Sequence, residues 1–281
     1  MKILLQRGAV LFFLLFLIVS LSSVQSPQLA HAIDTPKNAL DKILKDGTLH
    51  IGVSLFTPWT LKNTQGKLIG FEIDVAKQLA KDLGVQPQFH VLDWKNILPA
   101  LLSKKIDIII AGMTITPQRA LQVNFSQPYA ESGVGLATNM QLTKSFTSMN
   151  ELNRSNVTLA AVAGTVADDL ARRVFPKATI QTFPTSEKAI VAVTTGAVHG
   201  YIEHTPLPTF LTLDYPEKVD EPLSKPLLTT KAAFAINKGA PDFINFLNAW
   251  IIAHEADTWL TSAHKYWFKS LDWKKEVGPE K

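Results

Sequence analysis

A threonine, a proline and an arginine at the end of an apolar run have the types and spacing of an anion-binding site. Residues 107–119 are typical of a buried strand, a Gly-containing loop and a helix start, with Thr116 at the N-cap and Pro117 in the first turn. A capping box would place Glu or Gln three residues after Thr116, but the sequence has Arg119, a cation that a helix N-terminus disfavours. With the loop amides and the Thr114 hydroxyl, this guanidinium is suited to bind a carboxylate. The alternative is that Arg119 pairs with a surface acid.

A second helix start later in the chain has a similar design. Residues 158–163 predict a strand, Gly164 a turn, and Thr165 the N-cap of a helix with Asp168 in the capping-box position. Ligands of open α/β sheets bind beyond the carboxyl ends of the strands, so two such ends facing each other would form a cleft. The first-turn amides would then offer a second half-site for an anion. The alternative is an ordinary capped helix.

The elements that position these residues alternate between short β-rich runs and helical patterns. This alternation predicts an α/β architecture with largely parallel sheets. The predicted strands are residues 49–53, 89–91, 106–111, 134–138, 158–163, 179–183, 200–203 and 232–236. The predicted helices are residues 71–83, 97–102, 166–174, 186–195 and 243–268.

Bulk properties predict an exported protein. Residues 1–32 have a basic start, an apolar run from Ala9 to Val19 and a small-x-small cleavage pattern before Ile33, so we interpret them as a signal peptide. The chain of 281 residues has no cysteine, which excludes disulfides, thiolate metal sites and a lipid anchor. A net charge of +4 with scattered basic residues disfavours nucleic acid as a partner. We expect no metal and no cofactor.

Five segments in the first half of the mature chain form an ordered set of motifs: GTLHIGV (47–53), GFEIDVA (70–76), WKNILPAL (94–101), DIIIAGMTITPQR (107–119) and VNFSQPY (123–129). They resemble family 3 of the bacterial periplasmic solute-binding proteins, the polar-amino-acid receptors of ABC importers. The resemblance covers nearly all of the first half of the mature chain. It is weaker in the second half, where Gly164-Thr165 and residues 201–206 carry it.

The resemblance implies the two-lobed periplasmic-binding-protein fold of type II. In this fold each lobe is a sheet flanked by helices, two crossover strands join the lobes, and the lobes close over a ligand by a hinge motion. After the signal peptide (1–32), lobe 1 would comprise residues 33–138, lobe 2 residues 139–228, and residues 229–281 would return to lobe 1 as a strand and C-terminal helices.

Residue roles follow from the resemblance where positions match. The Gly112 carbonyl would bind the ligand α-amine, and Thr114 and Arg119 would hold its α-carboxylate. Thr165 and Val166 would add backbone donors from the second lobe. These five residues would hold the amine and carboxylate of the ligand between the two predicted strand ends.

Other positions complete the site or depart from the family pattern. Phe56 and Trp94 fall where aromatic residues sandwich the ligand side chain, with core packing as the alternative. The family's ammonium-binding aspartate is replaced by His204, a poor partner for an ammonium because neutral imidazole has no full negative charge. Either Glu203 or Glu131 supplies the charge, or the ligand lacks the usual amine geometry, as an organic acid or a modified amino acid would. Strand alternation predicts that only one of Glu203 and His204 faces the cleft.

The sequence therefore predicts a monomeric, periplasmic, non-enzymatic receptor. It would capture a small carboxylate-bearing ligand, an amino acid or organic acid, and deliver it to an ABC permease. The alternative is a cyclohexadienyl or prephenate dehydratase of the same fold, but the asparagine and glutamate that we associate with those enzymes are here Val166 and Leu207. A sensing domain of a receptor kinase is disfavoured because no membrane span follows before Lys281. The identity of the ligand is left open.

Overall fold

The computed structural model describes residues 38–277, so the predicted signal peptide (1–32) lies outside the described residues. The strands are β1 (Thr48–Val53), β2 (Leu61–Lys62), β3 (Leu68–Ile69), β4 (Gln86–Val91), β5 (Ile108–Ile109), β6 (Val123–Asn139), β7 (Thr158–Val162), β8 (Thr179–Phe183), β9 (Gly200–His204), β10 (Val219–Asp220) and β11 (Leu228–Asn237). The helices are α1 (Ala39–Asp46), α2 (Phe71–Leu83), α3 (Trp94–Leu102), α4 (Pro117–Ala120), α5 (Met140–Thr143), the 3₁₀ helix η1 (Met149–Leu152), α6 (Val166–Val174), α7 (Ser186–Thr194), α8 (Leu207–Asp214), α9 (Pro241–Ala256), α10 (Trp259–Phe268) and α11 (Lys274–Val277).

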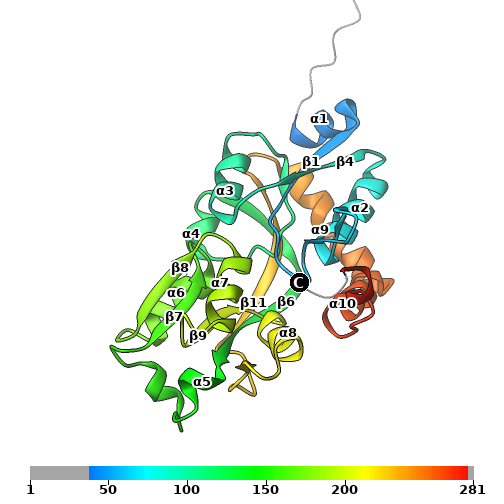
Figure 1. Cartoon of the computed structure of the whole chain (residues 1–281). Helices are drawn as coiled ribbons and strands as arrows, with labels where there is room; N and C mark the ends of the chain where they lie inside the picture. The colour runs from blue at the N-terminus through cyan, green and yellow to red at the C-terminus, as the bar shows by residue number, and fades with distance from the viewer. Residues whose placement is uncertain (1–37, 278–281) are drawn as a thin grey trace, which may run out of the picture. The chain divides into compact units, whose positions relative to one another are not determined.

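Nine strands form one mixed sheet, which confirms the predicted α/β class. The strand order is β4-β1-β5-β11-β6-β9-β7-β8, with β10 paired to β6, while β2 and β3 form a separate ribbon. Strand β1 is parallel to β4 and β5, and β7 is parallel to β8 and β9. Between these two parallel groups lie the antiparallel strands β6 and β11 (Figure 1). Strand β6 is longer than predicted because it continues from one group into the other.

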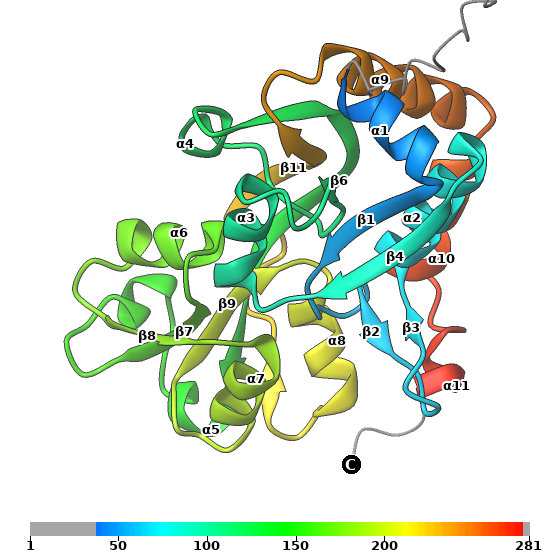
Figure 2. The same ribbon diagram turned by 90° about the horizontal axis from the view of Figure 1, so that it is seen from above.

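The two parallel groups have separate hydrophobic cores, and we call them lobe 1 (β1, β4, β5) and lobe 2 (β7, β8, β9). Lobe 1 packs against α2, α9 and α10, and lobe 2 against α6, α7 and α8 (Figure 2). The C-terminal helices reach lobe 1 because β11 pairs with β5. Strand β6 contributes Tyr129 to the first core and Val134 and Leu136 to the second, so it belongs to both.

Local sequence signals explain where the elements begin and end. Helix α2 has the predicted bounds, and Gly84 ends it with a left-handed φ of 70°. Ile108 and Ile109 of β5 are fully buried, as expected for a strand that lies inside a sheet.

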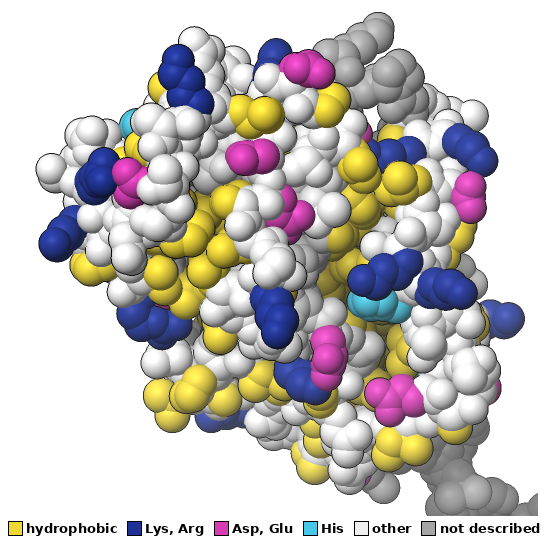
Figure 3. All heavy atoms as spheres, turned by 90° about the horizontal axis from the view of Figure 1, so that it is seen from below, with side chains coloured by type: hydrophobic (Ala, Val, Ile, Leu, Met, Phe, Trp, Pro, Cys, Tyr) yellow, Lys and Arg dark blue, Asp and Glu magenta, His cyan; other side chains and the backbone are white. Residues whose placement is uncertain are grey.

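Across residues 38–277, no helix combines the length and the apolar character needed to cross a membrane. On the face shown in Figure 3, basic and acidic side chains are interspersed.

Candidate functional site

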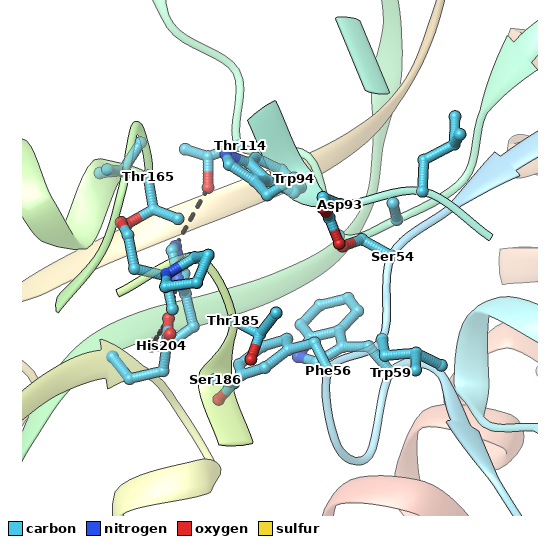
Figure 4. Close-up of a pocket in the computed structure, with 18 of the residues that line it drawn as sticks. Ser54, Phe56, Trp59, Asp93, Trp94, Thr114, Thr165, Thr185, Ser186 and His204 are labelled. Atoms are coloured by element: carbon cyan, nitrogen blue, oxygen red, sulfur yellow. Dashed lines mark hydrogen bonds and ion pairs between the residues drawn. The ribbon is translucent and has the colours of Figure 1, made fainter. Parts of the chain in front are cut away.

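A cavity of about 150 Å³ lies between the two lobes. Its walls come from the residues that end or follow β1, β4 and β5 in lobe 1 and β7, β8 and β9 in lobe 2, so the carboxyl ends of all six parallel strands meet there. The nine residues that the sequence predicted as ligand-binding all line this cavity, and Figure 4 labels Phe56, Trp94, Thr114, Thr165 and His204 among them. The nine are Phe56, Trp94, Gly112, Thr114, Arg119, Thr165, Val166, Glu203 and His204. Their contact with a ligand stays a prediction.

The Arg119 guanidinium contacts carbonyl groups of both lobes. Its Nη1 donates to the Thr114 carbonyl oxygen at 2.9 Å, and its Nη2 lies 3.5 Å from the Gly164 carbonyl oxygen. The guanidinium also lies over the Trp94 ring, 5.3 Å from the ring centroid. The two carbonyl groups and the indole ring are all uncharged. None of them therefore balances the positive charge of this half-buried side chain.

The charge of Arg119 has no ion-pair partner within 4.0 Å among residues 38–277. Burial lowers the pKa of the guanidinium, and the more distant Asp169 carboxylate raises it. The alternative that Arg119 pairs with a surface acid is therefore wrong. Thr116 caps α4 as predicted. This helix has only four residues, so its dipole opposes the Arg119 cation less than the dipole of a longer helix would.

In lobe 2, Thr165 is the N-cap of α6, as predicted. Its hydroxyl accepts a hydrogen bond from the Asp168 amide at 3.2 Å and donates to the Val162 carbonyl at 2.8 Å. The Asp168 carboxylate bonds to the Gly164 amide at 3.3 Å, one residue before the position that a capping box requires. The amide of Val166 in the first turn has no acceptor within the helix, so it is available to an anion.

Glu203 and His204 form a hydrogen-bonded pair at the end of β9. One Glu203 carboxylate oxygen accepts from the His204 amide at 2.8 Å and lies 3.0 Å from its Nδ1, while the other accepts from the Tyr201 hydroxyl at 2.6 Å. The His204 Nε2 lies 3.4 Å from the Thr114 hydroxyl of lobe 1. Both residues line the cavity, but the carboxylate of Glu203 is buried and bonded to Tyr201 and His204, so which of the two meets a ligand stays a prediction. The alternative residue, Glu131, pairs with Lys231 and does not line the cavity.

Three aromatic rings, those of Phe56, Trp59 and Trp94, also line the cavity (Figure 4). Phe56 meets the His204 ring edge-on at a centroid distance of 6.3 Å. The Trp94 indole N–H donates to the Gly164 carbonyl at 3.1 Å, so this ring joins the lobes as well as lining the cavity. Trp59 is only 2% exposed and packs against Phe268, although it also reaches the cavity wall. Phe56 and Trp94 are partly exposed, so core packing alone does not account for them.

A buried carboxylate behind the first-lobe loop was not predicted from the sequence. Glu72 accepts a hydrogen bond from the Gly112 amide at 2.7 Å and from the Tyr129 hydroxyl at 2.8 Å. Burial is the largest influence on its pKa and raises it from 4.5 to about 8. The only signal in the sequence is that Glu72 and Tyr129 both belong to segments that carry the family resemblance. Their contact depends on the packing of α2 against β6.

Comparison with known proteins shows the family of this chain. Residues 49–270 match the bacterial extracellular solute-binding proteins, family 3. The chain belongs to this family. Together with the cavity between its lobes, this membership confirms the predicted role as a solute-binding protein of the kind that serves ABC importers.

Individual relatives agree with family 3 membership. The L-cystine-binding protein TcyJ of Escherichia coli is 25% identical over 233 residues, which are 82% of this chain and 85% of the relative. A binding component of an ABC transporter from Wolinella succinogenes, solved in complex with lysine, is 31% identical with a TM-score of 0.76, covering 82% of this chain and 99% of the other. This structural likeness confirms the two-lobed type II fold. Cyclohexadienyl dehydratase of Pseudomonas aeruginosa is 26% identical over 154 residues, 54% of this chain and 58% of the enzyme.

Proposed function

We propose that this family 3 protein captures an amino acid by its carboxylate at Arg119 and delivers it to an ABC permease. The observation that supports this most directly is a half-buried guanidinium that faces the cavity without an ion-pair partner among residues 38–277. An uncompensated buried charge is costly, and a ligand carboxylate would remove that cost. Bidentate binding of a carboxylate suits a guanidinium better than the two single carbonyl contacts that it makes here.

The other predicted residues have compatible roles in this proposal. The Thr114 hydroxyl and the Val166 amide would donate to the same carboxylate from the two lobes, so that binding favours closure. The Gly112 carbonyl would accept from the α-amine, and Phe56 and Trp94 would cover the ligand side chain. Glu203 would act through His204, because its own oxygens are already hydrogen-bonded.

We also propose the remaining features that the sequence predicted. Residues 1–32 would be cleaved as a signal peptide, and the mature protein would act in the periplasm as a monomer. The proposed lobe boundaries, residues 138 and 228, lie on β6 and β11, the two strands that pass between the lobes, and Val134 and Leu136 of β6 already pack in the lobe 2 core.

We propose a binding role rather than catalysis, although the dehydratase relative keeps the enzyme as the second candidate. The two positions that we associate with catalysis in those enzymes are the apolar residues Val166 and Leu207, and Leu207 is buried. Neither side chain can transfer a proton. Incubation with prephenate or arogenate, followed by ultraviolet detection of an aromatic product, distinguishes the candidates. We expect no product, and turnover would establish the enzyme.

The binding role is tested by ligand screening followed by substitution of Arg119. A thermal-shift screen of amino acids and organic acids identifies a ligand, because binding to the folded state raises the melting temperature. Calorimetry should then show that Arg119→Ala weakens binding by roughly 30- to 5,000-fold, since truncating one partner of a buried charge pair costs about 2–5 kcal/mol. Arg154→Ala, which removes an exposed arginine paired with Glu151, is the control and should change affinity less than about twofold. Wild-type affinity in Arg119→Ala would refute the proposed role.

A further inference from the structure

A chain of hydrogen bonds runs through lobe 2 and ends at the cavity. It joins Ser186 of α7 to Tyr201, Glu203 and His204 of β9. The Ser186 and Tyr201 hydroxyl oxygens lie 2.8 Å apart, and Tyr201 donates to one Glu203 carboxylate oxygen at 2.6 Å. The other Glu203 oxygen lies 3.0 Å from Nδ1 of His204. Tyr201 is fully buried and does not belong to the cavity lining, so this chain connects it to the cavity.

The Glu203 carboxylate fixes the direction of each bond in this chain. A carboxylate can only accept, so the groups on both sides of it must each point a hydrogen at it. The Tyr201 hydroxyl hydrogen is therefore directed at Glu203, and Ser186 must donate to the Tyr201 oxygen. By the same argument, Nδ1 of His204 carries a hydrogen. A neutral imidazole has one ring hydrogen, so Nε2 of the neutral His204 ring is an acceptor.

Burial holds the chain in this arrangement. Ser186 and Glu203 are buried as well as Tyr201. A polar group that is buried without a partner costs free energy, so each side chain is held by the bonds that it makes here. Glu203 also accepts from the His204 backbone amide at 2.8 Å, so three donors restrict the rotation of its carboxylate.

The acceptor nitrogen of His204 points across the cavity toward lobe 1. Nε2 lies 3.4 Å from the Thr114 hydroxyl, and both side chains line the cavity (Figure 4). The contact is longer than a good hydrogen bond, which spans about 2.7–3.2 Å, so Thr114 holds Nε2 weakly. A ligand between the lobes would therefore meet a nitrogen that can accept a stronger bond.

We infer that Tyr201 is a positioning residue of the cavity, and that it acts through Glu203 to keep the His204 hydrogen on Nδ1. The ligand group that meets Nε2 must then carry a hydrogen to donate, as an amine or a hydroxyl does and a carboxylate does not. This second step rests on the proposed function, whereas the first concerns the protein alone. A partner behind an imidazole selects which ring nitrogen is free to bind, and here that partner is itself held by Tyr201.

Nitrogen-15 NMR of protein labelled at histidine tests the first step, because the shifts of the two ring nitrogens report which of them carries the hydrogen. The His204 signals are assigned by their loss in His204→Gln. In mildly alkaline buffer, the wild-type ring should carry its hydrogen on Nδ1. Tyr201→Phe should raise the fraction of rings with the hydrogen on Nε2, because the Glu203 carboxylate loses a donor and can turn.

Tyr129→Phe is the matched control for this measurement. It also removes a buried hydroxyl from a buried glutamate, Glu72 in lobe 1, and should leave the His204 signals unchanged. A wild-type His204 ring with its hydrogen on Nε2, or with hydrogens on both nitrogens, would overturn the inference even if Tyr201→Phe does not fold. Wild-type His204 signals in a folded Tyr201→Phe would overturn it too.

Calorimetry tests the second step with the amino acid that binds most tightly in a thermal-shift screen and with its 2-oxo analogue, which has a carbonyl in place of the amine. Tyr201→Phe should weaken binding of the amino acid about 3- to 10-fold, a part of what one hydrogen bond to a charged group contributes. It should change binding of the 2-oxo analogue less than about twofold. Tyr266→Phe, at an exposed tyrosine of α10, should change neither.

The outcomes of the two tests separate this inference from the proposed function. Equal losses for the amino acid and its 2-oxo analogue in Tyr201→Phe would show that Tyr201 only maintains the structure. Unchanged affinity for both in Tyr201→Phe would show that Nε2 does not meet the ligand, and the role of Arg119 would stand. If Arg119→Ala binds the amino acid like the wild type, the proposed function fails while the NMR result on His204 stands.

Discussion

Glu72 shows how a single residue can support the site without touching a ligand. Its carboxylate holds the Gly112 amide from behind, which fixes the loop whose carbonyl we propose to bind the α-amine. The Tyr129 hydroxyl completes the contact at 2.8 Å, and both side chains are buried. Burial disfavours the ionised carboxylate more than these two donors favour it, which is why its pKa rises to about 8.

This raised pKa predicts how stability depends on pH. The folded state binds a proton that the unfolded state releases between the unfolded pKa of 4.5 and the folded value of about 8. The stabilisation from Glu72 is therefore complete below pH 4.5 and is lost as the pH rises through 8. Between pH 5 and pH 8 the loss amounts to about 3–4 kcal/mol, since one pKa unit corresponds to about 1.4 kcal/mol. Glu72→Gln cannot ionise and should remove this loss.

Urea denaturation at several pH values checks the prediction. The wild-type protein should lose free energy of unfolding between pH 5 and pH 8 relative to Glu72→Gln, while the amide still accepts from Gly112. Glu255→Gln controls for the removal of one exposed carboxylate. Parallel pH profiles for the wild type and Glu72→Gln would show that the Glu72 carboxyl does not titrate in this range.

At the scale of elements, the loop after β5 depends on a glycine in a crowded position. Gly112 has a φ of 60°, a left-handed conformation that side chains disfavour, and an added Cβ would lie 3.1 Å from Cε3 of Trp59. Gly84 at the end of α2 has a similar φ of 70° but no atom within 4 Å of an added Cβ. The two glycines therefore separate backbone strain from steric crowding.

Alanine substitutions at these positions should differ in cost. Gly84→Ala should lower the free energy of unfolding by about 1 kcal/mol through the left-handed backbone alone. Gly112→Ala should lose about 1–2 kcal/mol more, because the Trp59 ring is itself packed and has little room to move. Gly112→Ala should also weaken ligand binding, because it would turn the carbonyl of residue 112 away from the ligand α-amine. Denaturation midpoints and calorimetry measure both effects, and equal costs at the two glycines would mean that the indole gives way freely.

The sequence predicted elements and their ends better than it predicted contacts between them. Helix α2, its stop at Gly84 and the caps at Thr116 and Thr165 depend on neighbouring residues, so local patterns were sufficient. The gathering of the nine site residues in one cavity followed from the family resemblance. The pairing of Glu72 with Gly112 joins residues 40 positions apart, and no local pattern records it.

At the scale of the whole molecule, the two lobes contact each other around the cavity without a ligand. The Trp94 indole donates to the Gly164 carbonyl, Arg119 approaches the same oxygen, and His204 approaches Thr114. Within residues 38–277, these three polar contacts join lobe 1 to lobe 2 around the cavity. A ligand carboxylate would replace the Gly164 carbonyl as the partner of Arg119. The hydrogen bond from Trp94 to Gly164 would remain. Trp94 should therefore slow the reopening of the lobes.

Trp94→Phe keeps an aromatic ring and removes only the N–H donor, so it should speed ligand release. One neutral hydrogen bond contributes about 0.5–1.5 kcal/mol, which corresponds to roughly 2- to 12-fold faster dissociation. Association should change little, because interface substitutions act mainly on dissociation. Stopped-flow measurement with the amino acid found by screening tests this. Trp250→Phe loses a comparable indole bond, to Asp82 at 2.8 Å, far from the cavity, and should leave both rates unchanged. If Trp94→Phe slows association and leaves dissociation unchanged, the indole guides the ligand in rather than holding the lobes together.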